Sequence, residues 1–309
     1  MPLTAADDDF HLGQSDDRSW TETAWFAAQV PERGLCIWTY PLFRHELGVM
    51  SCGIYVWEPG AEELWQLPYY RTWWHLAIPE GIQATSFELP NGLSYERLEP
   101  LSAYRVRYED GDQIRLDATF RSLHPPHEVG VEPGGHGHLD QFGHVTGELL
   151  LNGDRLEIDC IEMRDRTWSP RRESRQGAYL SYSYGAASPD SGFHLSTRYT
   201  PRRGRAEMLT GFELDGGRAV PLADGRCDVS RDDRGRVAGV RIAATRADGS
   251  TFKAEGEVVS RLALPGTPWF VWACVVRWRL GDGSELLGEH QDTWAPALLR
   301  RFLRDGSLP

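Results

Sequence analysis

The fold class is decided by the stretch Val145-Thr146-Gly147-Glu148-Leu149-Leu150-Leu151-Asn152-Gly153-Asp154-Arg155-Leu156-Glu157-Ile158-Asp159-Cys160-Ile161. Apolar and polar residues alternate on both sides of its centre, and this period of two places every second side chain on one face of a β-strand. The central Asn152-Gly153-Asp154 suits a tight turn that requires positive φ angles. The stretch therefore predicts a hairpin with strands at 145–151 and 155–161.

Similar short segments fill the chain from about residue 35 to residue 292, where Gly, Pro, Asn and Asp separate runs rich in β-branched and aromatic residues. Helical patterns are limited to 21–29 near the start and 296–303 at the end. The chain is thus expected to be all-β, with two consecutive antiparallel barrels or sandwiches and short terminal helices. Further strands are expected at 35–40, 52–57, 73–78, 102–108, 113–120, 178–184, 193–200, 206–214, 236–244, 251–260 and 272–280.

With 309 residues, the chain is long enough for two domains. We place the N-terminal β domain at 1–170 and the C-terminal β domain at 171–309, to within about 20 residues. The five cysteines are widely spaced, without the spacing of a zinc site or a disulfide framework. We expect them to be reduced core residues.

The net charge of −12 argues against a nucleic-acid partner, because such proteins need a basic face that releases counterions. No apolar run approaches the roughly 20 residues that span a bilayer. The N-terminus lacks the basic and apolar regions of a secretory signal. These features predict a soluble, cytoplasmic protein without a membrane span.

A highly charged segment follows the hairpin: Met163-Arg164-Asp165-Arg166-Thr167-Trp168-Ser169-Pro170-Arg171-Arg172. Pro170 cannot donate a hydrogen bond within a central strand, so the segment is expected to form an exposed or cleft-facing bend. So many arginines beside a carboxylate would shift pKa values, as happens in active sites. An ion-paired domain junction is the alternative interpretation.

This segment, preceded by His138-Leu139-Asp140-Gln141-Phe142-Gly143-His144-Val145-Thr146-Gly147-Glu148, resembles the signature of the hydroxyneurosporene synthase-like superfamily, which includes carotenoid 1,2-hydratases and AttH-like proteins. Members commonly show Gln-x-Gly-x-x-x-Gly and then Arg-Asp-His/Arg-Ser-Trp-Gly-Pro-Arg. The resemblance implies two lipocalin-like halves and a largely apolar cavity. It also implies activities such as alkene hydration, isoprenoid cyclisation or pericyclic ring closure, without a metal or an organic cofactor.

The resemblance also suggests catalytic residues, because hydratase members carry an Asp-His-x-Trp element. Asp165 and Trp168 match it, whereas Arg166 stands where those members have His. Arginine stays protonated and cannot act as a general acid or base. Alkene hydration without a cofactor needs a carboxylic acid kept protonated by burial and an aromatic face that stabilises a cation. We therefore take Asp165, Trp168 and Arg166 as the candidate catalytic residues.

Substrate-binding candidates come from the charged segment and from aromatic or polar clusters elsewhere. Arginines of the segment could instead orient a substrate carboxylate through paired hydrogen bonds. The tyrosines and tryptophans could line a ligand cavity or fill a core, and a His-Asp pair could be an acid-base dyad or an inert surface pair. His136, His138 and His144 lie among glycines, and no metal is expected there. The candidates are Arg164, Arg171, Tyr182, Tyr184, His138, Gln141, Trp73, Trp74, His290 and Asp292.

Two functions are favoured over a third possibility, a purely structural interaction module. One is a cofactor-independent lyase or isomerase, of the hydratase, dehydratase or cyclase type, that acts on a hydrophobic isoprenoid- or polyketide-like small molecule. The other is a lipocalin-like protein that binds an apolar ligand without chemistry.

Overall fold

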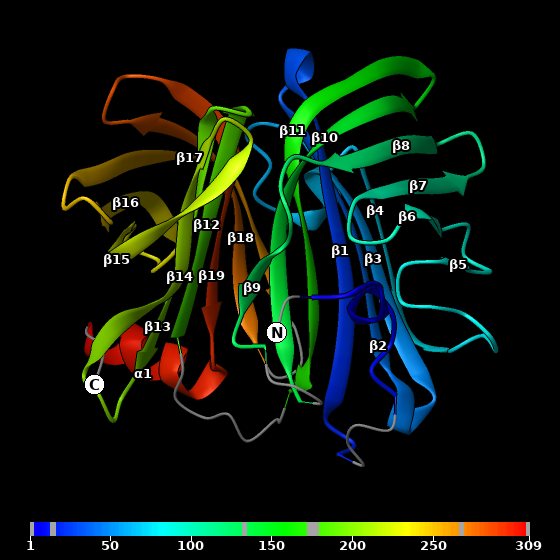
Figure 1. The fold of residues 1–309 in the computed structure, drawn as a ribbon, viewed down its shortest axis with the longest axis horizontal. Coiled ribbons are helices and arrows are strands. Elements are labelled where there is room, and N and C mark those ends of the chain that lie inside the picture. Colours follow the sequence, from blue (N-terminus) through cyan, green and yellow to red (C-terminus); the bar gives the residue numbers. More distant parts are fainter. Residues whose placement is uncertain (1–2, 13–16, 132–134, 172–178, 266–268, 307–309) are drawn as a thin grey trace. The chain divides into compact units, whose positions relative to one another are not determined.

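A computed structural model describes residues 3–12, 17–131, 135–171, 179–265 and 269–306. The chain forms two compact units (Figure 1). Unit 1 comprises Met1–Glu58 and Leu67–Arg171, and unit 2 comprises Pro59–Gln66 and Arg172–Pro309. Both are antiparallel β structures, which confirms the predicted all-β class with two barrel-like halves.

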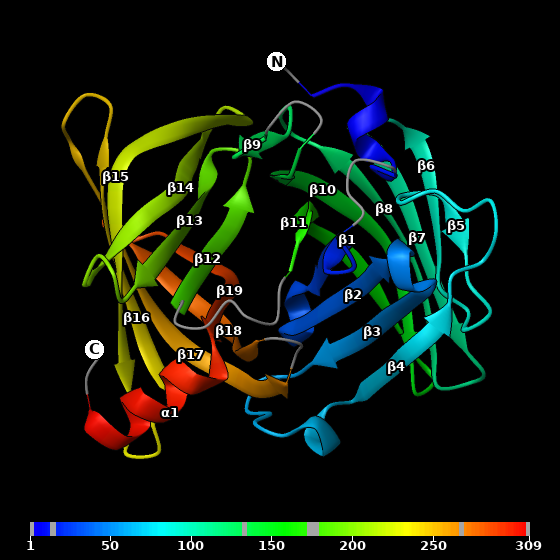
Figure 2. The same cartoon turned by 90° about the horizontal axis from the view of Figure 1, so that it is seen from below.

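Unit 1 is a strongly curled sheet of eleven strands, in the order β4-β3-β2-β1-β11-β10-β8-β7-β6-β5, with β9 added beside β10 (Figure 2). The strands are β1 (Trp20–Val30), β2 (Leu35–Arg44), β3 (Val49–Trp57), β4 (Tyr69–Ala77), β5 (Phe87–Glu88), β6 (Ser94–Glu99), β7 (Ala103–Asp110), β8 (Ile114–Ser122), β9 (His127–Val129), β10 (Gly137–Leu151) and β11 (Asp154–Pro170). Short 3-10 turns cover Ala5–Asp8 (η1), Pro31–Arg33 (η2) and His45–Leu47 (η3).

The predicted hairpin is confirmed as β10 and β11, which pair from Gly137↔Trp168 to Leu151↔Asp154 around a turn at Asn152 and Gly153. Both turn residues have positive φ, 51° and 92°, as this turn requires. The two strands are longer than expected.

The bend expected at the charged segment is wrong. Residues 163–170 form the last part of β11, which pairs with β10 on one side and β1 on the other. Pro170 is the last residue of the strand, opposite Trp20. At a strand terminus the missing N–H of proline interrupts no further ladder hydrogen bond. Arg172 lies outside the described residues.

The helix expected at 21–29 is also wrong, because this region is β1. Apolar residues occupy both faces of the strand, and the whole of β1 is buried. Such a two-sided apolar run has no strand-like alternation, and its alanines favour helix in isolation. Pairing with both β2 and β11 decides the outcome.

The inner face of the unit 1 sheet is tightly filled. Its core includes Phe26, Ile54, Tyr104 and Phe120, and a void lined by Phe26, Val106 and Phe120 among others measures about 20 Å³, enough for one water. This void has no room for an isoprenoid ligand. Two glycines of the resemblance motif serve this packing, since a side chain at Gly143 or Gly147 would overlap atoms of β8.

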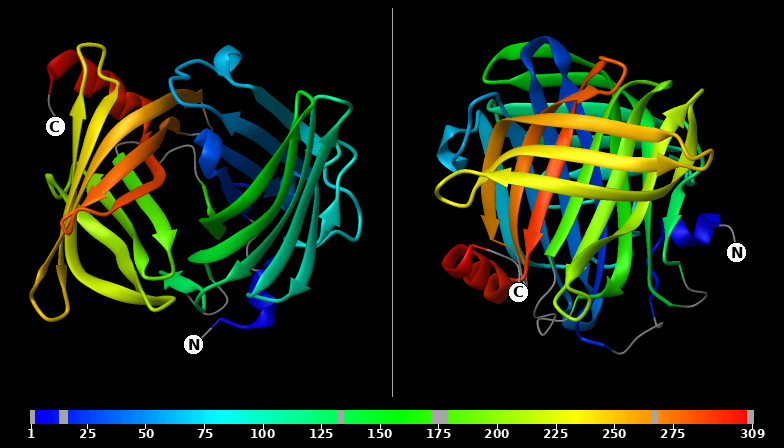
Figure 3. Two further views of the ribbon diagram at one scale, coloured as in Figure 1. Left: turned by 90° about the horizontal axis from the view of Figure 1, so that it is seen from above. Right: turned by 90° about the vertical axis from the view of Figure 1, so that its left-hand side faces the viewer.

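Unit 2 is a closed eight-stranded barrel in which β12 pairs with β19 (Figure 3). The predicted C-terminal helix is confirmed as α1 (Pro296–Asp305), whose Leu298 packs with Tyr179, Tyr199 and Trp294. A turn, η4 (Leu64–Gln66), belongs to the insert 59–66. The strands are β12 (Tyr179–Ser188), β13 (Ser191–Thr200), β14 (Arg205–Asp215), β15 (Arg218–Arg231), β16 (Val237–Arg246), β17 (Thr251–Pro265), β18 (Phe270–Leu280) and β19 (Glu285–Trp294).

Within the described ranges, no helix combines the length and the apolar character that crossing a membrane demands.

Candidate active site

Strand alternation divides the charged segment between the two faces of the unit 1 sheet. Ile158 and Cys160 belong to the core, so the even-numbered residues that follow along β11 also point to this inner face. Asp165 and Thr167, being odd-numbered, point to the opposite, outer face. The structure therefore separates Asp165 from Arg164, Arg166 and Trp168, although all four are close in sequence.

On the inner face, Arg164 is fully buried and its charge is compensated. Its Nε donates to Gln141 Oε1 (2.7 Å) and its Nη1 donates to Asp8 Oδ1 (3.2 Å). The guanidinium also lies 4.3 Å from the centre of the Tyr104 ring. Gln141 in turn donates to the backbone carbonyls of Leu101 and His124. These contacts give both predicted substrate-binding residues a structural role.

Arg166, two residues after Arg164 on β11, makes similar contacts. Its Nη2 donates to Glu22 Oε2 (3.1 Å) and to the carbonyl of Asp9, and its Nη1 donates to the carbonyl of Thr23 (3.3 Å). Both ions of the Arg166–Glu22 pair are fully buried. Arg164 and Arg166 thus attach the N-terminal segment, residues 4–11, to the inner face.

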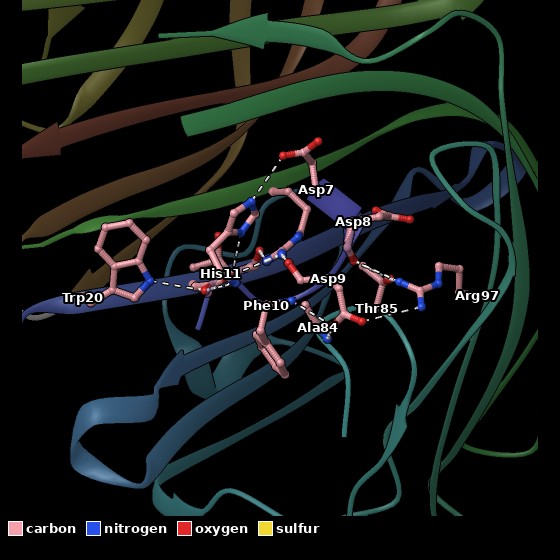
Figure 4. Close-up of polar contacts among 12 residues, drawn as sticks. Asp7, Asp8, Asp9, Phe10, His11, Trp20, Ala84, Thr85 and Arg97 are labelled. Carbon is pink, nitrogen blue, oxygen red and sulfur yellow. Dashed lines mark hydrogen bonds and ion pairs between the residues drawn. The ribbon is translucent and has the colours of Figure 1, made fainter. Parts of the chain in front are cut away.

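The N-terminal segment has further contacts with the sheet (Figure 4). Thr85 and Arg97 donate to the carbonyl of Asp8, and the His11 backbone N–H donates to Glu22 (2.8 Å). The His11 ring stacks on Trp168, with centroids 4.4 Å apart and planes at 4°. Burial would raise the pKa of Glu22, but hydrogen bonds from His11 and the charge of Arg166 outweigh it and hold this pKa below its ordinary value. Trp168 is therefore a packing partner of the N-terminal segment.

On the outer face, Asp165 has an unsatisfied carboxyl oxygen. Its Oδ1 is buried and accepts no hydrogen bond from the described residues. Its direct cross-strand neighbours are Asp140 on β10 and Trp25 on β1. Burial, followed by the charge of Asp140, raises the pKa of Asp165 to about 6, while the positive charges of His138 and Arg171 oppose the rise. Such a carboxyl group can both donate and accept a proton near neutral pH.

His138 is a fixed cation beside this carboxyl group. Its Nε2 donates to Asp140 Oδ1 (2.9 Å) and its Nδ1 shares a hydrogen bond with Thr167 Oγ1 (2.8 Å). Burial would lower the pKa of His138, but the charges of Asp140 and Asp165 and the hydrogen bond to Asp140 raise it to about 9. The imidazole is therefore protonated at neutral pH, and its two N–H groups are already engaged.

Aromatic rings continue this outer face across β1, β2 and β3. Trp25 meets Trp38 edge-to-face at 5.6 Å, and Trp38 lies 4.6 Å from Trp57. Tyr55 lies 5.3 Å from Trp57. We call these four residues the aromatic wall. It begins at Trp25, the cross-strand neighbour of Asp165, so the carboxyl group lies at the edge of a row of aromatic rings whose three tryptophans are buried.

The family model described as "Domain of unknown function (DUF7064)" matches residues 4–294. The chain belongs to the DUF7064 family. Among solved structures it resembles a putative AttH from Nitrosomonas europaea, with a TM-score of 0.63 and 12% identity, covering 96% of this chain and 99% of that one. No curated protein matches the chain.

Two further solved structures share the fold. CghA with Sch210972 has a TM-score of 0.59 at 14% identity, covering 90% of this chain and 88% of that one. Kievitone hydratase from Nectria haematococca has a TM-score of 0.57 at 11% identity, covering 96% of each chain. The neighbours confirm the AttH-like double lipocalin fold that the charged segment indicated. At such low identity they establish the fold alone for this member of the DUF7064 family.

The remaining predicted residues of this DUF7064 chain belong to β4, β12 and β19. Trp73 of β4 packs on the unit 1 core, while Trp74 is largely exposed. In unit 2, the Tyr182 ring lies 6.1 Å from Tyr184 and 4.5 Å from His194.

His290 and Asp292 lie inside the barrel of unit 2, so the interpretation as a solvated surface pair is wrong: both are fully buried. Alternation along β19 places them on the same face as Leu286, a core residue. His290 Nδ1 shares a hydrogen bond with Ser183 Oγ (2.8 Å), and burial lowers the pKa of His290 to about 4. Asp292 accepts two hydrogen bonds from Arg231 (2.7 and 2.8 Å).

From the sequence, neither Tyr40 nor any residue of the aromatic wall was identified as a site residue. The sequence contains a signal for four of these residues, because Trp38 and Tyr40, like Tyr55 and Trp57, are spaced two apart and so share a strand face. No comparable signal exists for Trp25, since residues 21–29 do not alternate.

Proposed function

We propose that this chain is a cofactor-independent lyase of the hydratase or cyclase type, in which Asp165 moves a proton to and from an alkene lying on the aromatic wall. The observation that carries the proposal is the unsatisfied Oδ1 of Asp165, buried beside Trp25. A buried polar atom without a partner is costly in a folded protein. Such an atom can take part in a hydrogen bond or a proton transfer with a substrate.

The reaction conserves atoms and charge in the following way. Protonated Asp165 donates its proton to one alkene carbon, and the other carbon becomes a cation that the faces of Trp25 and Trp38 stabilise. Water then adds to this cation and returns a proton to the Asp165 carboxylate. The net result is addition of H and OH, and elimination follows the same steps in reverse. In a cyclisation, a second double bond attacks the cation in place of water and closes a ring. A carbon next to the resulting new cation then loses its proton to the Asp165 carboxylate, and a double bond forms.

His138 adjusts this acid without taking part in proton transfer. Its positive charge favours the carboxylate form of Asp165, whereas burial and Asp140 favour the protonated form. These opposing effects bring the pKa of Asp165 to about 6, and a general acid-base group is most effective when its pKa is close to the pH of the reaction. Thr167 and Asp140 hold the imidazolium in place.

Two further features support the proposal. The aromatic wall suits a hydrophobic, unsaturated substrate of the isoprenoid or polyketide kind. One protein with the same fold is named a hydratase, a class of enzyme that adds water to a double bond. The main competing function is binding of an apolar ligand without chemistry, as other lipocalin-like proteins do.

The proposal is tested by incubating the protein in D₂O with prenylated phenols, acyclic isoprenoids and linear polyenes, and by following deuterium and water incorporation by mass spectrometry. Asp165→Asn should lower turnover by about 100-fold or more, the usual contribution of a general acid. Asp159→Asn is the matched control, because Asp159 lies on the same strand and is exposed. Full activity of Asp165→Asn would contradict the proposal.

A measurement that needs no substrate accompanies this test. Infrared titration of the folded protein should show a carboxyl group with a pKa of about 6 that disappears in Asp165→Asn. Absence of such a group would also contradict the proposal, and a co-purified ligand that stays unchanged throughout would favour the binding protein.

A further inference from the structure

We infer that the substrate carries an anionic oxygen, in a carboxylate or an ionised phenol or enol, which binds to Arg171 and Tyr40 beside Asp165. The inference rests on the proposed function, because it assigns the substrate class of the same site. Its first support is the position of Arg171. The backbone N–H of Arg171 donates to the carbonyl of Ser19 (2.7 Å), so the residue directly after β11 is held against the start of β1.

The Arg171 side chain extends to the outer face. Its Nη1 donates to the hydroxyl of Tyr40 (3.1 Å). Tyr40 lies two residues after Trp38 on β2, so both side chains project from the same face of the strand. The charges of Arg171 and Asp165 are close enough to shift each other's pKa. Arg171, Tyr40 and Asp165 therefore occupy one region of the outer face.

The charge of Arg171 differs from that of the other described arginines in the segment. Arg164 is paired with Asp8, and Arg166 is paired with Glu22. The neighbouring cation on the outer face, His138, is paired with Asp140. Over the described part of the chain, no carboxylate lies within ion-pairing distance of Arg171. An arginine held beside a candidate acid without a carboxylate partner is suited to a charged ligand.

The hydrogen-bonding capacity of this pair identifies the ligand chemistry. A guanidinium has five N–H donors in a planar fork, and the bond to Tyr40 uses one of them. The remaining donors match the two oxygens of a carboxylate, or a single phenolate or enolate oxygen. The Tyr40 hydroxyl accepts from Arg171, so its own hydrogen can point to the same anion. The substrate class is thus an unsaturated acid, anchored at Arg171 with its alkene near Asp165 and Trp25.

Calorimetric titration with simple aromatic probes tests the inference. 2-Naphthoate should bind the wild-type chain about tenfold more tightly than its uncharged methyl ester, the usual scale for a charged hydrogen bond. Arg171→Gln should remove this preference while leaving the affinity for the ester unchanged, and Tyr40→Phe should reduce the preference in part. Arg155→Gln is the matched control, since Arg155 lies on the same strand and is exposed. A nitrophenolate at mildly alkaline pH distinguishes a phenolate site from a carboxylate site.

Equal affinities for acid and ester, a preference that survives in Arg171→Gln, or no binding of any anionic probe would each overturn the inference. Far-UV circular dichroism of each variant checks that it is folded. Asp165→Asn separates this test from that of the proposed function, because it should keep the preference for the acid while losing turnover. If Asp165→Asn loses turnover but Arg171→Gln does not change the preference for the acid, the proposed function is supported and only the inference of an anionic substrate is wrong.

Discussion

Asp165 and Arg166 are adjacent in the chain, yet their side chains lie on opposite faces of β11. Arg166 forms a buried ion pair with Glu22 on the inner face, whereas Asp165 lies opposite Trp25 and Asp140 on the outer face. One residue thus helps to hold the N-terminal segment, and its neighbour has a buried carboxyl oxygen that accepts no hydrogen bond from the described residues. Substitutions at the two positions should therefore affect stability and turnover differently.

Asp165→Asn should stabilise the protein at neutral pH. The pKa of Asp165 rises from 3.8 to about 6 on folding, so the folded state binds the proton more tightly than the unfolded state. Stability therefore falls as the pH rises from about 4 to about 6, by at most about 3 kcal/mol for a shift of roughly two units. Thermal unfolding at several pH values should show the variant above wild type at pH 7, with the difference vanishing near pH 4. A lower melting temperature of the variant at pH 7 would argue against the raised pKa.

Breaking the Arg166–Glu22 pair should destabilise the protein. Arg166→Leu leaves Glu22 buried without its cationic partner, a change that typically costs about 3–5 kcal/mol. Urea unfolding gives the loss, and hydrogen exchange should show faster exchange in residues 4–11. The double variant Arg166→Leu with Glu22→Leu should recover part of the stability, because no unpaired charge remains. An Arg166→Leu variant as stable as wild type would contradict the structural role.

His138 should stabilise the folded state below neutral pH and lose this contribution at high pH. Its pKa is raised from 6.5 to about 9, so the folded state holds the proton more tightly than the unfolded state. The contribution is complete below about pH 6.5 and disappears as the pH rises through about 9. Unfolding measured across this range should show a fall in stability that His138→Gln lacks. NMR titration of the His138 ring provides the direct check, and a midpoint below pH 7 would refute the assignment.

The two candidate tryptophans should respond differently to substitution by phenylalanine. Trp25→Phe weakens the π surface beside Asp165 and should lower turnover by about tenfold, within the usual range of cation–π contributions. Trp168→Phe keeps a ring against His11 on the inner face and should change the free energy of unfolding while leaving turnover near wild type. Steady-state rates with denaturation curves separate the two effects. The reverse pattern would return the catalytic role to Trp168.

Local chemistry in the sequence determined the β architecture and indicated Asp165 as a candidate residue. The alternation on both sides of Asn152-Gly153 predicts the β10–β11 hairpin because turn and strand preferences act over neighbouring residues. The charged motif around Asp165 predicts that this residue belongs to the functional site. The terminal helix was likewise recognisable from the spacing of its apolar residues.

Only the tertiary structure decided which groups surround Asp165. Trp25 becomes its neighbour through the pairing of β1 with β11, strands that are far apart in the chain, and no local pattern specifies which distant strands pair. Strand alternation separates Asp165 from Arg166 and Trp168. The sequence predicted a bend here, and a bend has no such alternation, so only the structure reveals the separation. The charge state of His138 depends on Asp140 and Asp165 together, because pKa values in a folded protein reflect burial and nearby charges that exist only after the strands have assembled.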